Sequence, residues 1–220
     1  MKSILSTKKF TLAQKELLLN SGLTFVEYNA ISIEFVPFNA PKQIENAIFT
    51  SKNAVKAVFS IKKRTPKIKN CFCVGEKTKA LLEENGQKVV KTTQYGSEMA
   101  DYLIKNHKND TFYFFCGNKR LETIPKALKE ENITFSEIET YETVLNPKHF
   151  QRQFDGVLFF SPSAVQSFVS ENKLKNSIAF CMGTTTAAEA KKHTENVVIA
   201  NSTSVESVIA KAVKTLKNYD

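Results

Sequence analysis

Hydroxyl and glycine residues recur in this chain directly after short apolar runs, and segment 155–168 is the clearest case. Four apolar residues, 157–160, predict a buried strand that is too short to be an independent helix. Ser161 then suits a helix N-cap, and Pro162 suits the first helical position because its missing N–H is not needed there. A helix that begins directly after a strand leaves backbone N–H groups free. Such a turn can bind an anion.

Variants of this strand–turn–helix unit make up nearly the whole chain. Strand-like apolar segments alternate with helix-like periodic segments, which predicts an α/β fold with parallel sheets. Segment 24–36 is long for a single strand and can include a connector. We expect strands at 2–6, 24–36, 47–51, 71–75, 89–90, 112–116, 135–144, 157–160, 178–182 and 197–199, and helices at 11–20, 53–61, 78–85, 97–105, 123–131, 162–168, 187–193 and 205–216.

An internal repeat divides the chain into four parts, in the order short, long, short, long, which implies two similar α/β domains. The repeat alone does not fix which short part pairs with which long part. If the middle two form one domain, the first and last form the other, and 30–36 and 138–145 are the crossings. Ligands of parallel sheets bind beyond the carboxyl ends of the strands, so two facing edges would form a cleft. The matching segments are 48–55 with 159–165, 72–78 with 180–186, and 18–27 with 128–137.

The charge balance allows two interpretations. The chain has 31 Lys and Arg residues against 22 Asp and Glu residues, a formal net charge of +9. An anionic partner would explain the excess, whereas the even spread of lysines also fits a lysine-rich composition without functional meaning. A nucleic-acid-binding protein would need a clustered basic face with aromatic platforms. The sequence has no such cluster, so we expect no nucleic-acid partner.

The cysteine and histidine residues predict no metal centre. Cys71, Cys73, Cys116 and Cys181 lie in apolar runs without CxxC spacing, and the histidines lie far apart, so buried thiols in a reducing compartment are expected. Charged residues interrupt the N-terminal region where a signal peptide would lie. No apolar run approaches the about 18 residues of a membrane span. We therefore expect a cytoplasmic protein with no membrane partner.

A set of motifs resembles the uroporphyrinogen-III synthase family over nearly the whole chain. Each motif alone is weak, but the ordered set is specific. The resemblance implies two flavodoxin-like α/β domains, one discontinuous at 1–30 plus 146–220 and one at 37–137, joined by linker strands 31–36 and 138–145. The motifs are Phe49-Thr50-Ser51 with Ala54-Val55, Val74-Gly75 with Thr78, Cys116-Gly117-Asn118 with Pro125-Lys126-Ala127-Leu128, Tyr141-Glu142-Thr143-Val144, Phe160-Ser161-Pro162-Ser163, and Gly183 with Thr185-Thr186-Ala187.

The resemblance also implies a reaction. Members of this family close the linear tetrapyrrole hydroxymethylbilane to uroporphyrinogen III, a lyase step of haem biosynthesis that inverts the last pyrrole ring and releases water. They use no metal and no cofactor, and they are usually monomeric. The substrate is a polycarboxylate, so backbone N–H groups, hydroxyl groups and a positive field suit its binding. Holding the flexible substrate folded can supply much of the rate enhancement.

Residue by residue, the resemblance assigns a catalytic role to Tyr141, whose phenol could help the substrate hydroxyl to leave. Tyr141 could instead be a linker aromatic that only packs between domains. Thr78, Ser161 and Thr186 match substrate-binding positions, although each could simply be a helix cap or a first-turn hydroxyl. The other substrate-binding candidates are Ser51, Ser97, Asn118, Ser163 and Thr185.

The sequence departs from the family in two turns. Residues 6–8 read Ser-Thr-Lys where many members have an Arg-Pro pair, and Asn53 stands where some members carry Arg. A fold alone does not fix chemistry, so a non-catalytic two-domain binding protein for a polyanionic small molecule remains the alternative. Three lysines in the relevant turns could compensate for the missing arginines: Lys52, Lys77 and Lys119.

Overall fold

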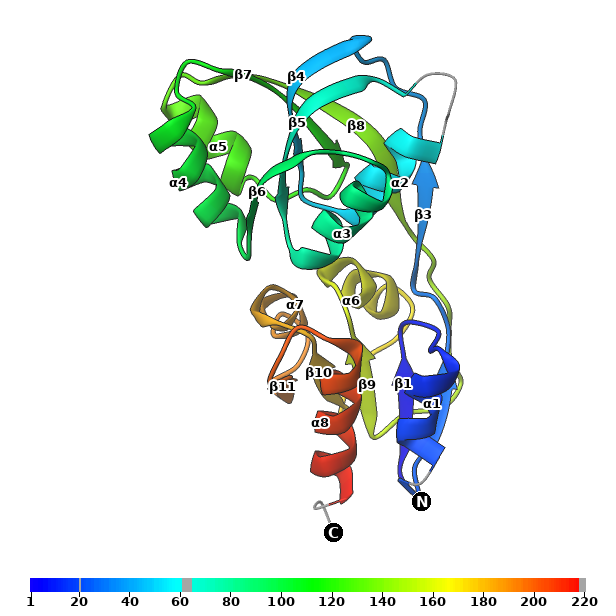
Figure 1. Ribbon diagram of the computed structural model, residues 1–220. Helices are drawn as coiled ribbons and strands as arrows, with labels where there is room; N and C mark the ends of the chain where they lie inside the picture. The colour runs from blue at the N-terminus through cyan, green and yellow to red at the C-terminus, as the bar shows by residue number, and fades with distance from the viewer. Residues whose placement is uncertain (20, 61–64, 218–220) are drawn as a thin grey trace. The chain divides into compact units, whose positions relative to one another are not determined.

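The computed structural model describes residues 1–19, 21–60 and 65–217. The chain divides into two compact units: unit 1 is Met1–Ser32 with Val144–Asp220, and unit 2 is Ile33–Thr143. Each unit contains a sheet with helices on both faces (Figure 1). No helix within the described ranges is long and apolar enough to cross a membrane.

Unit 1 contains, in chain order, β1 (Ser3–Ser6), α1 (Leu12–Leu19), β2 (Thr24–Glu27), β9 (Gly156–Phe159), α6 (Pro162–Val169), β10 (Ile178–Cys181), α7 (Thr184–Ala190), β11 (Val197–Ile199) and α8 (Val205–Lys217). The strands form a parallel sheet in the order β11-β10-β9-β1-β2. Helices α1 and α8 pack on one face of this sheet, and α6 and α7 pack on the other. The parallel α/β arrangement expected from the sequence is confirmed.

Unit 2 contains β3 (Ile31–Phe35), β4 (Gln43–Phe49), α2 (Lys52–Ser60), β5 (Lys67–Val74), α3 (Glu76–Glu84), β6 (Val89–Thr93), α4 (Gly96–Asn106), β7 (Thr111–Gly117), α5 (Thr123–Glu130) and β8 (Thr134–Leu145). The first residues of β3 and the last residues of β8 fall in unit 1. The sheet order is β3-β8-β7-β4-β5-β6, and the strands from β8 to β6 are parallel. Helices α2 and α3 pack on one face, and α4 and α5 pack on the other.

The central strands are buried on both faces, which explains their unbroken apolar sequences. In β9, Val157 and Phe159 pack toward α6 and α7, whereas Leu158 packs toward α1 and α8. All three side chains are fully buried. Burying one such side chain stabilises the fold by about 1.5–3 kcal/mol relative to leaving it exposed. In β4, Ile48 and Phe49 divide between the two faces in the same way.

The two sheets have the same strand order once the chain is permuted. If β1, β2, β9, β10 and β11 are counted from 1 to 5, unit 1 has the flavodoxin order 2-1-3-4-5. Five strands of unit 2 have this order as well when β7 and β8 are counted first, followed by β4, β5 and β6, and β3 adds a sixth strand beside β8. The two middle parts of the sequence repeat therefore share one sheet, and the first and last parts share the other.

Several element bounds differ from the sequence-based expectation. The expected strand 24–36 is two strands, β2 and β3, in different sheets, separated by a connector at 28–30. Strands β4 and β5 begin four residues before the expected 47 and 71. Their first residues alternate between polar and apolar, so the apolar runs mark only the fully buried halves of these strands.

The expected helix 97–105 begins one residue earlier, and Ser97 does not cap it. Instead, Glu98 Oε2 accepts hydrogen bonds from the N–H groups of Gln94 and Tyr95, at 2.9 and 3.1 Å. The expected helix 187–193 also begins earlier, at Thr184. The final expected residues of helices 11–20 and 53–61 lie outside the described residues.

Candidate active site

Tyr141 lies on β8 opposite Gly117, the last residue of β7. The strands keep one register as far as the pair Cys116–Glu139, and the register then shifts so that Thr140 has no partner on β7. Such an extra residue is a β-bulge, which can redirect the side chain beside it. A Cβ atom at position 117 would lie 2.5 Å from Cε2 and Cζ of the Tyr141 ring. The bulge and the glycine together seat this ring against the end of β7.

The Tyr141 side chain lines a cavity of about 250 Å³ at the carboxyl ends of β4, β5 and β7. Thr50, Ser51, Lys119 and Arg120 also line it. Burial raises the pKa of Tyr141 above its ordinary value of 10.0, and interaction with the Ser51 side chain offsets part of this rise. The phenol is therefore protonated at neutral pH. It can act as a hydrogen-bond donor or as an acid.

The two cations of this cavity differ in their ion pairs. The Arg120 guanidinium contacts Glu122 at 2.5 Å and Glu137 at 2.7 Å, so two carboxylates fix it and balance its charge. Lys119 is exposed, and its ammonium group has no carboxylate partner in the part of the chain that the structure describes. Lys119 is therefore the better placed of the two to attract an anionic ligand.

Thr78 and Thr186 occupy equivalent places in the two units, each three residues after the glycine that follows a strand. They are only 5% and 3% exposed. Among the described residues, nothing forms a hydrogen bond with either hydroxyl. Neither hydroxyl oxygen is among the enclosed, unpartnered polar atoms of the described residues, which are Tyr28 Oη and Ser167 Oγ. The two threonine hydroxyls can therefore donate to or accept from a ligand at this edge of the sheet.

Ser51 and Ser161 are also equivalent in the repeat, and both hydroxyls accept a hydrogen bond from the first turn of a helix. Ser161 Oγ accepts from the Ala164 N–H at 3.2 Å, which confirms the N-cap expected from the sequence. Ser51 Oγ accepts from the Asn53 N–H at 3.1 Å, and Ser51 also adjoins Tyr141 in the cavity. The remaining candidates on helices divide by exposure: Ser163 is buried, whereas Ser97 and Thr185 are exposed.

Asn118 lies directly after Gly117, and its contacts are to β8. Its backbone N–H donates to the Tyr141 carbonyl, and its side-chain oxygen accepts from the Thr143 N–H. The structure thus brings Ser51, Asn118 and Tyr141 together at one edge of unit 2. Ser161, Ser163, Thr185 and Thr186 lie after β9 and β10 of unit 1.

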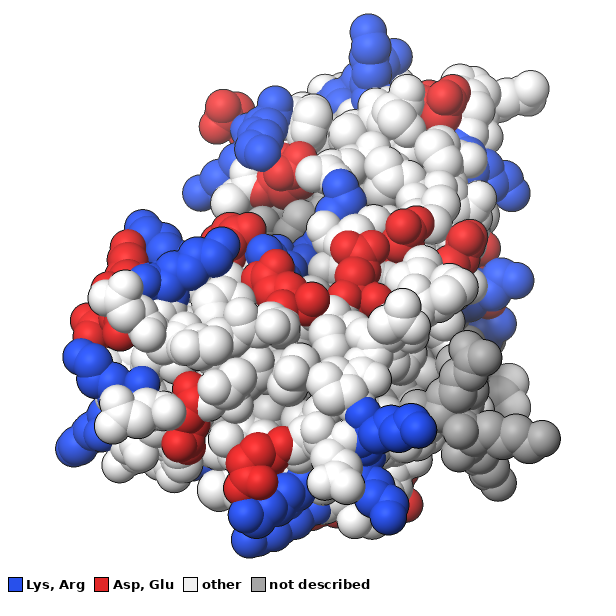
Figure 2. Space-filling view, turned by 90° about the horizontal axis from the view of Figure 1, so that it is seen from above, with Lys and Arg blue, Asp and Glu red and all other residues white. Residues whose placement is uncertain are grey.

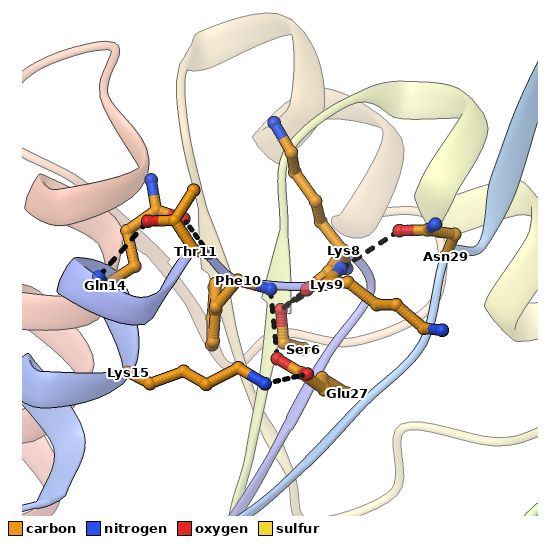
Figure 3. Close-up of polar contacts among 9 residues, drawn as sticks. All are labelled: Ser6, Lys8, Lys9, Phe10, Thr11, Gln14, Lys15, Glu27 and Asn29. Atoms are coloured by element: carbon orange, nitrogen blue, oxygen red, sulfur yellow. Dashed lines mark hydrogen bonds and ion pairs between the residues drawn. The ribbon is translucent and has the colours of Figure 1, made fainter.

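Unit 1 has a compact polar turn after β1, which the sequence analysis did not identify (Figure 3). Glu27 accepts a hydrogen bond from the Phe10 N–H at 2.9 Å and pairs with Lys15 at 2.6 Å. The side chains of Lys8 and Lys9 extend away from these contacts (Figure 3). No local sequence signal indicates this turn, because Glu27 comes from a strand well after it in the chain.

The described residues contain no group of three or more His, Cys, Asp or Glu side chains arranged to hold a metal ion. The four cysteines are free and buried. Burial raises the pKa of Cys71 and Cys181 to about 12. These thiols are therefore protonated at neutral pH, unlike the thiolates that bind metals or act as nucleophiles.

Charged residues of both signs are interspersed on the face of the molecule shown in Figure 2. Lys and Arg side chains stand beside Asp and Glu side chains there and do not merge into a basic area. The described residues of this face form no continuous positive surface of the kind that typically tracks a nucleic-acid backbone.

Two sheets of flavodoxin order, each ending in hydroxyl-bearing turns, define a two-unit α/β protein of the kind that binds ligands at its strand ends. The chain belongs to the uroporphyrinogen-III synthase family, because the family model described as "Uroporphyrinogen-III synthase HemD" matches residues 13–210. It is therefore an enzyme, a lyase of haem biosynthesis. The sequence-based interpretation is confirmed, and the comparisons give no support to the non-catalytic alternative.

Solved structures with the same fold carry the same family name. A uroporphyrinogen-III synthetase from Helicobacter pylori is 22% identical, with a TM-score of 0.71 over 98% of this chain and 100% of that one. A mutant uroporphyrinogen III synthase from the extremely thermophilic bacterium Thermus thermophilus is 13% identical, with a TM-score of 0.68 over 100% of both chains. At these identities the likeness shows the fold, and the family match carries the assignment.

Proposed function

We propose that the chain cyclises hydroxymethylbilane to uroporphyrinogen III, with Tyr141 assisting the loss of the substrate hydroxyl. The observation that carries this proposal is the position of the Tyr141 phenol. It is protonated, lines a cavity and lies at the carboxyl edge of the unit 2 sheet. Open parallel sheets bind their ligands at this edge. Membership of the family supports hydroxymethylbilane as the substrate.

The size of the cavity suggests which part of the substrate it takes. A site for a whole small molecule usually measures about 300–1,000 Å³. At about 250 Å³, this cavity suits one end of a linear tetrapyrrole, which we propose is the last ring with its hydroxymethyl group. Lys119 lines the same cavity and suits a carboxylate of that ring.

In the proposed reaction, the phenol donates its proton to the hydroxyl oxygen while the carbon–oxygen bond breaks. The lone pair of the pyrrole nitrogen forms the azafulvene cation, and the oxygen leaves as water. Hydroxide is a far stronger base than a phenolate, so a phenol of raised pKa still protonates this leaving group. Ring closure then proceeds through a spiro intermediate. The proton released when the product forms restores the phenol.

The substrate carboxylates need donors, and the free hydroxyls of Thr78 and Thr186 supply them. A hydrogen bond to a charged group contributes about 1.5–3 kcal/mol, roughly twice a neutral one. We propose that these two threonines bind substrate carboxylates. We assign supporting contacts to Ser51, Ser97, Ser161, Ser163 and Thr185.

The test is the substitution Tyr141→Phe, which removes only the phenolic oxygen. The measured quantities are the rate of product formation and the ratio of isomers III and I after oxidation and chromatography. We expect Tyr141→Phe to lower the rate of isomer III formation by about 100-fold or more. The matched control is Tyr113→Phe, because Tyr113 is a partly buried tyrosine on β7 of the same unit. Equal rates for the two variants would remove Tyr141 from the mechanism.

We further propose that the enzyme acts as a monomer in the cytoplasm. The family supports the monomer, and four free cysteines support a reducing compartment. Light scattering during gel filtration tests the first point, because a dimer would double the measured mass. Cell fractionation tests the second.

A further inference from the structure

Strand β7 ends at Gly117, whereas β8 runs on beyond it to Leu145. Beyond the end of β7, Asn118 forms the hydrogen bonds with β8. Its backbone N–H donates to the Tyr141 carbonyl at 3.3 Å, and its Oδ1 accepts from the Thr143 N–H at 2.9 Å. Asn118, which is exposed, thus contacts β8 at both Tyr141 and Thr143.

The bulge residue Thr140 is held as well. It is fully buried, its Oγ1 donates to the Cys116 carbonyl at 3.2 Å, and its carbonyl accepts from the Val36 N–H at 3.1 Å. Tyr141 therefore lies between an anchored residue on one side and the Asn118 contacts on the other. Removing the Asn118 side chain would take away the acceptor of the Thr143 N–H, while the Asn118 backbone contact with Tyr141 and the contacts of Thr140 stay in place.

We propose that Asn118 is a positioning residue for Tyr141. In this inference, which rests on the proposed function of Tyr141, Asn118 fixes the end of β8 so that the phenol reaches the substrate hydroxyl. Asn118 is not among the residues that line the Tyr141 cavity, although its neighbours Gly117 and Lys119 are. Asn118 therefore affects a substrate ring in this cavity indirectly, through the position of β8 and Tyr141. A displacement of about 1 Å can lower a rate by about 100-fold.

The test uses two substitutions, one that removes the hydrogen-bond acceptor of the side chain and one that keeps it. Asn118→Ala removes the acceptor of the Thr143 N–H, whereas Asn118→Asp keeps an acceptor oxygen in the same place. For isomer III formation, we expect Asn118→Ala to lower kcat by about 10- to 100-fold with little change in KM. We expect Asn118→Asp to restore kcat to near the wild-type value. Any repulsion of substrate carboxylates by Asp would raise KM.

Both substitutions are then repeated in the Tyr141→Phe background. We expect Asn118→Ala to lower kcat no further there, because no phenol remains to be positioned. A wild-type kcat in Asn118→Ala would overturn the proposal. So would an equal rise in KM with either Tyr or Phe at position 141, because that pattern marks a direct substrate contact.

The single variant Tyr141→Phe separates the two hypotheses. If it keeps full turnover, the proposed function of Tyr141 fails, and the positioning role of Asn118 fails with it. If it loses turnover while Asn118→Ala does not, only the positioning role fails. Thermal denaturation of each variant shows whether the unit is still folded. If Asn118→Ala unfolds, the test relies on Asn118→Asp, measured with Tyr and with Phe at position 141. If Asn118→Asp with Tyr141 has a kcat as low as that of Tyr141→Phe, the acceptor oxygen does not position Tyr141.

Discussion

The ring of Tyr141 lies so close to Gly117 that no side chain fits between them. A Cβ atom at position 117 would stand 2.5 Å from Cε2 and Cζ of the ring and 2.9 Å from Cδ2. The preceding residue, Cys116, packs with the helices on the other face of the sheet. The space above Gly117 therefore exists only because this residue is a glycine, and the phenol occupies it.

We predict that Gly117→Ala displaces Tyr141 and lowers both activity and stability. Inserting a methyl group into a filled site usually costs about 1–3 kcal/mol, because side chains and backbone must shift. Denaturation midpoints measure the stability, and isomer III formation measures the activity. Gly96→Ala is the steric control. A Cβ at Gly96 would stand 3.8 Å from the nearest atom, Cγ1 of Ile124.

The expected order of stability is Gly96→Ala above Gly117→Ala, since alanine is also the better helix former at the start of α4. A Gly117→Ala protein with wild-type stability and turnover would mean that the ring moves freely and that its position does not matter.

The fold was largely predictable because its strongest signals are local. The apolar run 157–160 predicts a strand buried on both faces, and β9 is such a strand. Ser161 and Pro162 predict a helix start, and α6 begins there. Where strands start with alternating polar residues, as β4 does, the sequence analysis placed the first residue too late.

The geometry of the site was less predictable because it depends on contacts between distant segments. Tyr141 is seated by a register shift between β7 and β8, and no local pattern marks Thr140 as the extra residue. The family resemblance named Tyr141, but it did not reveal the contacts of Asn118 with β8. Likewise, the link between Glu27 and Phe10 joins β2 to the turn after β1.

We predict that Thr78→Val and Thr186→Val lower kcat/KM without lowering stability. Valine has the shape of threonine but no hydroxyl, and neither hydroxyl has a hydrogen-bond partner among the residues described here. Losing a hydrogen bond to a carboxylate costs about 1.5–3 kcal/mol, which is about a 10- to 100-fold loss in kcat/KM. Steady-state kinetics and thermal denaturation measure the two quantities.

Thr7→Val is the contrasting variant for the threonine experiment. Thr7 is also buried, but its Oγ1 donates to the Leu158 carbonyl at 2.7 Å. Its replacement should cost about 0.5–1.5 kcal/mol of stability, because a buried hydrogen bond is lost while the Leu158 carbonyl keeps the Thr7 backbone N–H as a donor. If Thr78→Val and Thr186→Val destabilise the protein as much as Thr7→Val does, their hydroxyls are structural.

We predict that Ser161→Ala destabilises the protein, whereas Ser97→Ala does not. Ser161 Oγ caps α6 through the Ala164 N–H, and loss of an N-cap typically costs about 1 kcal/mol. Ser97 lies inside the first turn of α4, which is capped through Glu98. Urea denaturation of both variants measures the difference. Equal midpoints would contradict the assigned caps.

The last prediction concerns Glu27, whose contacts appear in Figure 3. Partial burial raises the pKa of this carboxyl, but the Lys15 ion pair and the hydrogen bond from the Phe10 N–H outweigh it, so the pKa lies below the ordinary 4.5. A carboxylate with a lowered pKa stabilises the folded state above its unfolded pKa, and this stabilisation disappears as the pH falls through the folded pKa.

Glu27→Gln should therefore lower stability at pH 7, by about 1 kcal/mol for a partly exposed charged hydrogen bond. The difference from wild type should shrink as the pH falls through the folded pKa of Glu27, which lies below 4.5, since the wild-type carboxyl then becomes neutral as well. Glu45→Gln is the control, because Glu45 and its partner Lys69 are 60% and 67% exposed and such pairs contribute little. A difference for Glu27→Gln that stays constant from pH 7 to pH 3 would show that shape, and not charge, accounts for the effect of Glu27.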